Sequence, residues 1–282
     1  MQLRLSAPAK LNLFLHITGQ RADGYHELQT IFQLLDIGDE LHFEHRNDGQ
    51  LTLSSNYTEV ACDDNLIIRA ARALQQHSNT RYGANIALDK RLPSGAGLGG
   101  GSSDAATTLL GLNQLWKLQL SLSDLAAIGV NLGADVPVFI YGKNAWAEGI
   151  GDILAPVETP QHNYLLIYPA CSVPTAAIFR DKNLTRDTSP ITLAAFLEGG
   201  GHNDCETVVR QTFPEVDKAL KTLAKYGQFQ MTGTGSCLFG QMQSESEAYT
   251  VQKQLPKHWQ SFVAKGVALS PCHQQLGITH KK

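Results

Sequence analysis

Residues 92–106 read LPSGAGLGGGSSDAA, and five glycines fall within the seven positions 95–101. Glycine permits positive φ angles and lets a ligand approach the main chain closely. The following residues, AATTLLGLNQLW, have a composition typical of a helix, which we expect at about 103–116. The unpaired N–H groups at a helix start favour anions, and a glycine loop leading into them adds further donors. The stretch therefore predicts a phosphate-binding loop.

Two common phosphate loops do not fit this stretch. The Walker pattern requires a lysine after the glycines, and no Lys or Arg occurs between Arg91 and Lys117. The dinucleotide pattern G-x-G-x-x-G can be written through three of the glycines, but the strand-rich residues 1–90 lack the βαβ context. A merely flexible turn is disfavoured, because each glycine gives up about 0.5–1 kcal/mol relative to alanine in ordered structure. The positive charge for a phosphate must come from another segment.

The composition excludes several classes of protein. The chain has 282 residues, 43% hydrophobic, and a formal net charge of −3, so no global basic field favours nucleic acid or an anionic membrane. No run is long and apolar enough for a membrane span, and we expect no cleavable signal. The five cysteines are widely spaced and form no C-x-x-C pattern, which predicts free thiols in the cytoplasm. The scattered histidines predict no metal site.

The order of predicted elements favours an α+β fold over a doubly wound sheet. Residues 3–18 predict strands broken at Pro8, residues 28–46 extended structure, and residues 134–142 a further strand. Residues 155–163 contain Pro156 and Pro160 and few large apolar residues, and this shift in composition suggests a boundary. We therefore expect domains at 1–155 and 156–282, with the last strand near 261–270 able to pack back on the first domain.

Residues 93–106 resemble the central phosphate-loop motif of the GHMP small-molecule kinases. Two further motifs of that family are matched in order, by SAPAKLNLFL at 6–15 and by MTGTGSCLFG at 231–240. The resemblance implies a two-domain fold, with an N-terminal ribosomal-protein-S5-domain-2-like nucleotide-binding domain and a C-terminal ferredoxin-like α/β sandwich. It also implies ATP as phosphoryl donor and Mg²⁺ as its counterion.

One branch of the family is most similar to this chain, on residues 8–30, 97–106 and 132–140. Gly100 and Gly101 lengthen the family's usual Gly-Leu-Gly-Ser-Ser-Ala loop, which fits this branch. The implied partner is a small molecule, a cytidine diphosphate-linked methylerythritol phosphorylated on its tertiary 2-hydroxyl. Another GHMP acceptor, such as mevalonate or a sugar, and a nucleotide-binding regulator without turnover remain alternatives. We expect a monomer or weak homodimer.

The resemblance assigns the chemistry to Lys10 and Asp135. Lys10 lies among apolar residues in AKLNLFL, where the structural alternative is an edge lysine. Asp135 precedes Pro137, where a carboxylate is often only a turn cap. A nearby ammonium group keeps a carboxylate ionised and stabilises a developing alkoxide. We interpret Asp104 as a capping residue and leave the Mg²⁺ ligands unassigned.

The remaining candidates divide between the two ligands. Tyr25 and His26, in DGYHEL, are similar to the cytidine-binding pair of the branch, and Asn12 shares a strand face with Lys10. The expected substrate-binding residues are Asn12, Tyr25, His26, Thr175, Gly233, Thr234 and Gly235. The expected ATP-binding residues are Asn65, Leu66, Pro93, Ser94, Gly95, Ala96, Gly97, Leu98, Gly99, Gly100, Gly101, Ser102 and Ser103.

Overall fold

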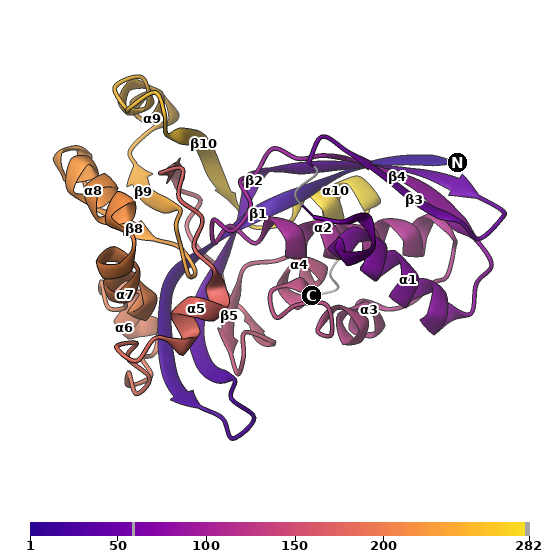
Figure 1. Cartoon of the computed structure of the whole chain (residues 1–282), viewed down its shortest axis with the longest axis horizontal. Helices are drawn as coiled ribbons and strands as arrows, with labels where there is room; N and C mark the ends of the chain where they lie inside the picture. The colour runs from indigo at the N-terminus through magenta and orange to yellow at the C-terminus, as the bar shows by residue number, and fades with distance from the viewer. Residues whose placement is uncertain (58–59, 280–282) are drawn as a thin grey trace.

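The computed structural model describes residues 1–57 and 60–279, except for the side chain of Cys62. Two lobes lie side by side, and two long strands run through both of them (Figure 1). These strands are β1 (Gln2–Gln20) and β2 (His26–Arg46), which form an antiparallel ladder from Gln2–Glu44 to Gln20–His26. The ladder makes one continuous frame on which the elements of both lobes are mounted.

Strand β1 is unbroken at Pro8, so the predicted interruption there is wrong. The ladder absorbs the proline through a register shift between Pro8 and Lys10. Proline lacks an N–H group, and a bulge is one of the places where a strand tolerates that loss. The predicted continuity of the 28–46 strand agrees with β2.

The first lobe packs helices against one face of its sheet (Figure 1). Its further strands are β3 (Leu51–Ser55), β4 (Gly83–Asp89), β5 (Ala145–Glu148) and β6 (Ile153–Pro156). Its helices are η1 (Cys62–Asp64), α1 (Leu66–Ser78), α2 (Gly100–Leu115), α3 (Leu122–Gly129), α4 (Val136–Tyr141) and α10 (Pro271–Leu276). Helix α2 lies centrally and is buried along most of its length, because its small and apolar residues contact the sheet and neighbouring helices.

Two of these helices differ from the sequence expectation. Helix α2 begins at Gly100, within the glycine run rather than after it. Residues 136–141 form helix α4 and not the predicted strand. A short apolar run does not distinguish strand from helix by its pattern. Here Pro137 lies in the first helical turn and Gly142 ends the helix at φ 72°, which are favourable positions for both residues.

The second lobe has an antiparallel sheet with helices beside it (Figure 1). Its strands are β7 (Asn163–Tyr168), β8 (Phe229–Met231), β9 (Leu238–Met242) and β10 (Gln260–Val267). Its helices are α5 (Thr175–Arg180), α6 (Leu193–Leu197), α7 (Asp204–Thr212), α8 (Pro214–Leu223), η2 (Ala224–Tyr226) and α9 (Glu245–Gln252). Leucine, valine and methionine side chains of these elements form a separate core.

Strand β10 links the two lobes, because it pairs with β7 and, at Gly266 and Val267, with β2. The sheet is therefore continuous from β3 to β8. Apart from the parallel pair β3–β4, its ladders among residues 1–57 and 60–279 are antiparallel, which makes the fold α+β. The division at residue 155 stays a prediction. No helix in the described part of the chain has the length and apolarity to cross a membrane.

Candidate active site

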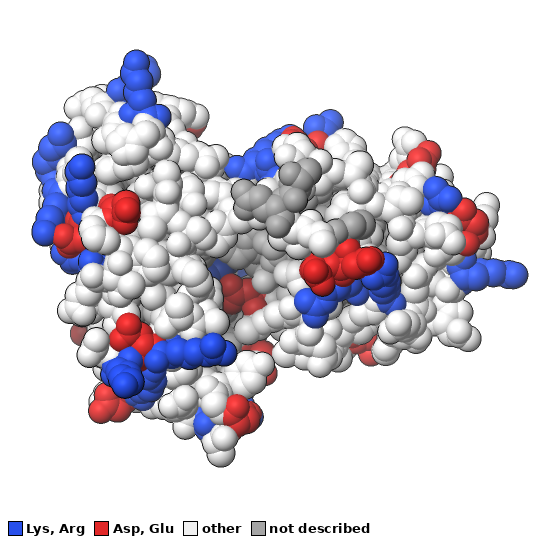
Figure 2. All heavy atoms as spheres, in the orientation of Figure 1, with Lys and Arg blue, Asp and Glu red and all other residues white. Residues whose placement is uncertain are grey.

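A cavity of about 1250 Å³ opens between the two lobes. The molecular surface is hollowed where the lobes meet, and charged side chains lie inside the hollow (Figure 2). The cavity walls come from β1, β2, the glycine loop, the starts of α1, α2 and α4, helix α5 and the turn before β9. All residues that the sequence assigned to a site line this cavity, with the exception of Ser103 and Gly235.

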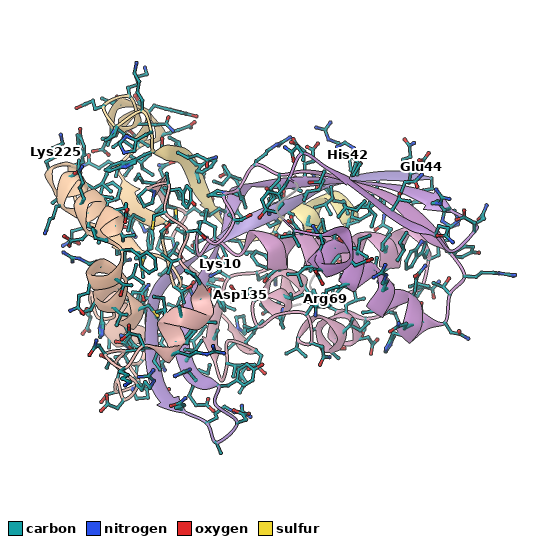
Figure 3. All side chains as sticks on the ribbon, in the orientation of Figure 1. Lys10, His42, Glu44, Arg69, Asp135 and Lys225 are labelled. Atoms are coloured by element: carbon teal, nitrogen blue, oxygen red, sulfur yellow. The ribbon has the colours of Figure 1, made fainter. Side chains whose placement is uncertain are left out.

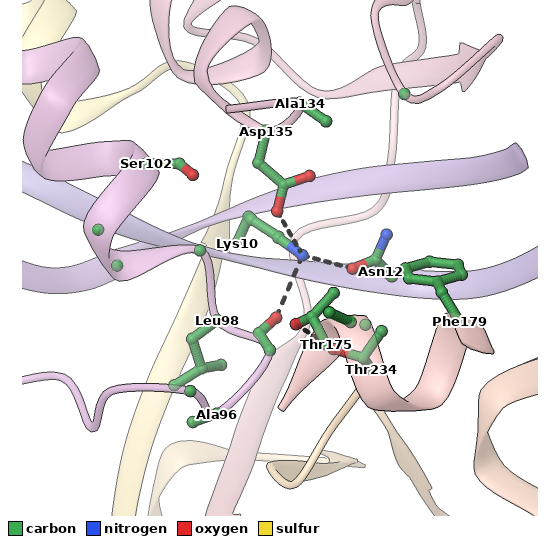
Figure 4. Close-up of a pocket in the computed structure, with 18 of the residues that line it drawn as sticks. Lys10, Asn12, Ala96, Leu98, Ser102, Ala134, Asp135, Thr175, Phe179 and Thr234 are labelled. Carbon is green, nitrogen blue, oxygen red and sulfur yellow. Dashed lines mark hydrogen bonds and ion pairs between the residues drawn. The ribbon is translucent and has the colours of Figure 1, made fainter. Parts of the chain in front are cut away.

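Lys10 lies at the centre of the cavity, where the lobes join, and points toward Asp135 (Figures 3 and 4). Its Nζ atom is 3.3 Å from Oδ2 of Asp135 and donates hydrogen bonds to Oδ1 of Asn12 at 2.5 Å and to the carbonyl of Gly97 at 3.1 Å. Only 3% of the lysine is exposed. The edge-lysine alternative is therefore excluded, because this ammonium group is held inside the site by three oxygens.

Asp135 occupies the N-cap position of α4, but its side chain makes no capping hydrogen bond. The carboxylate instead faces Lys10 and is 32% exposed. A carboxylate that is ion-paired on one oxygen and open to the cavity is placed to accept a proton from a bound hydroxyl group.

The glycine loop passes between β1 and the second lobe. The carbonyl of Leu98 accepts a hydrogen bond from the N–H of Lys10 at 3.0 Å, and the carbonyl of Ala96 accepts one from the N–H of Cys237 at 3.1 Å. Three of its glycines have positive φ angles: Gly95, Gly97 and Gly99. Backbone conformation therefore favours glycine at these three positions, whereas Gly100 and Gly101 belong to helix α2.

Helix α2 begins in this loop with Gly99 as its N-cap, and no side chain caps it. Gly100, Gly101 and Ser102 form its first turn on the cavity wall. The N–H groups of a first turn have no partner within the helix, and they lie at the positive end of its dipole. Ser103 belongs to the same turn, but its side chain is fully buried and does not reach the cavity.

A buried ionic cluster lies beneath the loop, and sequence reasoning missed it. Nζ of Lys90 is 2.6 Å from Oδ2 of Asp39 and 2.8 Å from Oδ2 of Asp104. Asp39 also accepts hydrogen bonds from the N–H groups of Arg91 at 2.6 Å and Leu92 at 2.8 Å. Asp39 therefore anchors the main chain where the glycine loop begins. Through Lys90 and Asp104 it also anchors helix α2, which follows the loop.

The interpretation of Asp104 as a capping residue is wrong, because this carboxylate is buried and bonded to Lys90. Burial raises the pKa of Asp104 to about 7, although Lys90 opposes the shift. Burial by itself would lower the pKa of Lys90, but the two carboxylates raise it above its usual value. The signal in the sequence was Lys90 itself, which directly precedes the lysine-free stretch.

The opposite end of the cavity has an aromatic and polar wall. Tyr25 is exposed, and His26 is buried with its ring stacked on Phe179 at a centroid distance of 5.1 Å. Arg186 donates a hydrogen bond from Nε to Nε2 of His26 at 3.0 Å. Phe179 and Arg186 were not among the sequence candidates, because residues 172–205 are polar and turn-rich and gave no clear motif.

The remaining candidates take defined positions. Asn65 caps α1 by accepting a hydrogen bond from the N–H of Ile67, and Leu66 follows it on the cavity wall. The hydroxyl groups of Thr175 and Thr234 are 2.9 Å apart (Figure 4). Gly235 does not line the cavity, but its N–H closes the turn by donating to the carbonyl of Thr232.

Comparisons with known proteins agree with this architecture. The model of the GHMP kinases N terminal domain matches residues 65–143, and the model of the GHMP kinases C terminal domain matches residues 184–261. A crystal structure of Methanococcus jannaschii mevalonate kinase has the same fold, with a TM-score of 0.68 at 15% identity over 95% of this chain and 98% of that chain. A glycine loop at a helix start, facing the Lys10–Asp135 pair between these two lobes, agrees with the two family models, and the chain is a GHMP kinase.

Relatives with higher sequence identity show which family of GHMP kinases the chain belongs to. A protein of Pseudomonas paraeruginosa named 4-diphosphocytidyl-2-C-methyl-D-erythritol kinase is 55% identical over 276 residues, which are 98% of both chains. One of the same name from Chromohalobacter salexigens is 53% identical, covering 98% of this chain and 95% of its own. A crystal structure of 4-(cytidine 5'-diphospho)-2C-methyl-D-erythritol kinase has a TM-score of 0.82 at 32% identity, covering 94% of this chain and all of that one. The chain belongs to the 4-diphosphocytidyl-2-C-methyl-D-erythritol kinase family.

Proposed function

We propose that this chain transfers the γ-phosphoryl group of ATP to the 2-hydroxyl of 4-diphosphocytidyl-2-C-methyl-D-erythritol, giving the 2-phosphate and ADP, in the non-mevalonate route to isoprenoids. The relatives at 53–55% identity carry the name of this activity. The observation that carries the proposal is the 3.3 Å pair of Lys10 and Asp135, which lies in one cavity with the start of α2 and the wall around His26. In our proposal ATP and the phosphoryl acceptor bind in this one cavity, on either side of Lys10 and Asp135.

Phosphoryl transfer needs positioning and charge stabilisation more than covalent chemistry. In our proposal the phosphates of ATP lie against the first turn of α2, where the helix dipole and free N–H groups attract anions. Lys10 supplies the cation that the loop itself lacks. Asp135 accepts the proton of the acceptor hydroxyl group, and the adjacent ammonium stabilises the charge that develops on its oxygen.

A magnesium ion bound to ATP fits the oxygens present near the start of α2. Mg²⁺ keeps several waters and binds through one or two protein oxygens together with substrate phosphates. Ser102 lines the cavity, and Oδ1 of Asp104 is buried with no hydrogen-bond partner among the described residues. Ser102 and Asp104 would hold the ion, which would neutralise phosphate charge. The described residues contain no group of three or more His, Cys, Asp or Glu side chains that could hold a metal ion by themselves.

The acceptor occupies the other half of the cavity in this proposal. Tyr25 and Phe179 supply aromatic faces for a pyrimidine, and His26 supplies a polar edge. Asn12, held by Lys10, and the Thr175–Thr234 pair supply hydrogen-bonding groups near the reacting hydroxyl. We further propose that residues 1–155 and 156–282 act as the two domains, and that the enzyme is a cytoplasmic monomer or weak homodimer that does not bind nucleic acid.

Release of ADP with and without acceptor tests the proposal. We expect turnover with the cytidine-linked acceptor and little with mevalonate, galactose or no acceptor. Lys10→Met and Asp135→Asn should each lower kcat by roughly 10²–10⁴ while the protein remains folded. Lys225→Met is the matched control, because Lys225 lies on the second lobe away from the cavity (Figure 3). Wild-type turnover in either site variant would remove that residue from the mechanism, and a preference for mevalonate would refute the proposed acceptor.

A further inference from the structure

Arg186 makes an unusual contact, because it donates to a histidine ring rather than to a carboxylate. Its Nε–H bonds to Nε2 of His26 at 3.0 Å. Its other contacts are to main-chain carbonyl oxygens, at 2.9 Å to Leu184, 2.9 Å to Phe179 and 2.7 Å to Asp181. Four of the five N–H donors of a guanidinium group are thereby engaged by fixed acceptors, so its plane cannot turn away from His26.

This contact determines the protonation of the imidazole. Arginine has only donors, so Nε2 of His26 must present its lone pair to Arg186. A neutral imidazole carries its single proton on the other nitrogen, which is Nδ1. The pKa of His26 also lies below its usual value, because the ring is buried and because Arg186 adds positive charge beside it. His26 is thus a neutral side chain whose Nδ1 is a donor.

The Nδ1–H group is the polar group of the ring that Arg186 leaves for a ligand. His26 lines the cavity, and none of the residues described in the structure hydrogen-bonds to its Nδ1 atom. The ring face toward Phe179 is covered, so the ring offers its edge rather than that face to a ligand. N3 of cytosine is an acceptor, whereas N3 of uracil carries a proton. A fixed N–H donor can therefore hydrogen-bond to N3 of cytosine, whereas at N3 of uracil it would face another N–H donor.

We propose that Arg186 is a positioning residue that fixes His26 as an Nδ1–H donor and thereby makes the acceptor site select cytosine over uracil. This inference rests on the proposed function, because it assumes that the pyrimidine of the acceptor lies beside His26. It assigns specificity to a side chain that need not touch the base. The sequence separation of 160 residues between the two partners explains why no local motif contains both.

The first test is a tautomer measurement on the free protein. Long-range ¹H–¹⁵N correlation NMR, assigned with His26→Gln, should show protonated Nδ1 and unprotonated Nε2 in the wild-type ring near neutral pH. In Arg186→Gln the side-chain amide oxygen can accept a hydrogen bond from an Nε2–H group, so the spectrum should change toward the Nε2–H form or a mixture. A wild-type ring protonated on Nε2, or a spectrum that Arg186→Gln leaves unchanged, would overturn the proposal.

The second test measures selectivity. We compare kcat/KM for the cytidine diphosphate-linked acceptor and for its uridine analogue by ADP release. The wild-type ratio should favour cytidine, and Arg186→Gln should reduce this ratio by roughly 10-fold or more, because a wrongly paired buried donor is costly. At saturating cytidine acceptor, kcat should change much less than the ratio.

A double-mutant comparison separates positioning from a structural role. If Arg186 only held the segment that carries Phe179, its loss would lower kcat/KM for both acceptors equally, and would do so in a His26→Ala background as well. If it acts through His26, Arg186→Gln has no further effect on the ratio in that background. Equal losses for both acceptors would overturn the inference. Failure of the proposed function would differ, since it would abolish acceptor-dependent ADP release while leaving the tautomer result intact.

Discussion

Replacing Gly97 by alanine should destabilise the protein and impair the site together. Gly97 has a φ of +75°, and an added Cβ atom would lie 2.2 Å from the carbonyl oxygen of Thr232, a main-chain atom of the second lobe. The left-handed conformation costs a residue with a Cβ atom roughly 1–2 kcal/mol. Overpacking against a rigid neighbour costs about 1–3 kcal/mol more. Because the clash is between two main-chain segments, the loop or the turn at Thr232 must shift.

The expected loss of roughly 2–5 kcal/mol should lower the Tm by about 3–8 °C in a scanning calorimetry experiment on a chain of this size. The carbonyl of Gly97 also accepts the hydrogen bond from Lys10. A displacement of the loop by about 1 Å can cost on the order of 10²-fold in rate, so kcat should fall in the ADP-release assay as well.

Gly101→Ala is the matched control from the same loop. An added Cβ there meets only a side-chain atom of Leu66, at 3.6 Å, and the residue lies in the first turn of α2. Alanine is favoured over glycine in a helix by about 0.5–1 kcal/mol, so the Tm should stay the same or rise. An unchanged Tm in Gly97→Ala, or an equal fall in Gly101→Ala, would refute the reasoning.

Three further predictions concern buried groups. Asp39→Asn should raise the KM for ATP more than it lowers kcat, because Lys90 loses a charged partner and the loop loses its anchor; an equal fall of kcat at saturating ATP would contradict this role. Asp104, with a pKa raised to about 7 by burial, contributes stability below its unfolded pKa of about 4 that is lost as pH rises toward 7. Thermal melts of Asp104→Asn should therefore be less pH-dependent over that interval than those of the wild type, and parallel curves would exclude the shift. Burial raises the pKa of the Cys237 thiol to about 12, so a thiol reagent should modify the partly exposed Cys171 before Cys237 in native protein, as peptide mass spectrometry would show; equal labelling of these two would contradict the buried position.

The site was predictable where its chemistry is local in the chain. The positive φ angles of the glycine loop and the start of a helix behind it are properties of a few consecutive residues. Lys10 and Asp135 could each be read as a structural residue within its own segment, and the family resemblance supplied both their roles and their pairing. Helix α4 was missed for the same local reason, since six apolar residues suit a strand as well as a helix.

The sequence by itself determined the α+β class and the glycine loop that leads into a helix, because glycine conformation and helix initiation are read from neighbouring residues. The kind of chemistry was predicted from the resemblance of three motifs to the GHMP kinases. Only the tertiary structure decided which distant side chains meet. Asp39 reaches Lys90 and Asp104 from another strand, Arg186 reaches His26 from the second lobe, and Thr232 limits the space at Gly97. These contacts join segments that are far apart in the chain, and their geometry depends on how β1 and β2 hold the two lobes together.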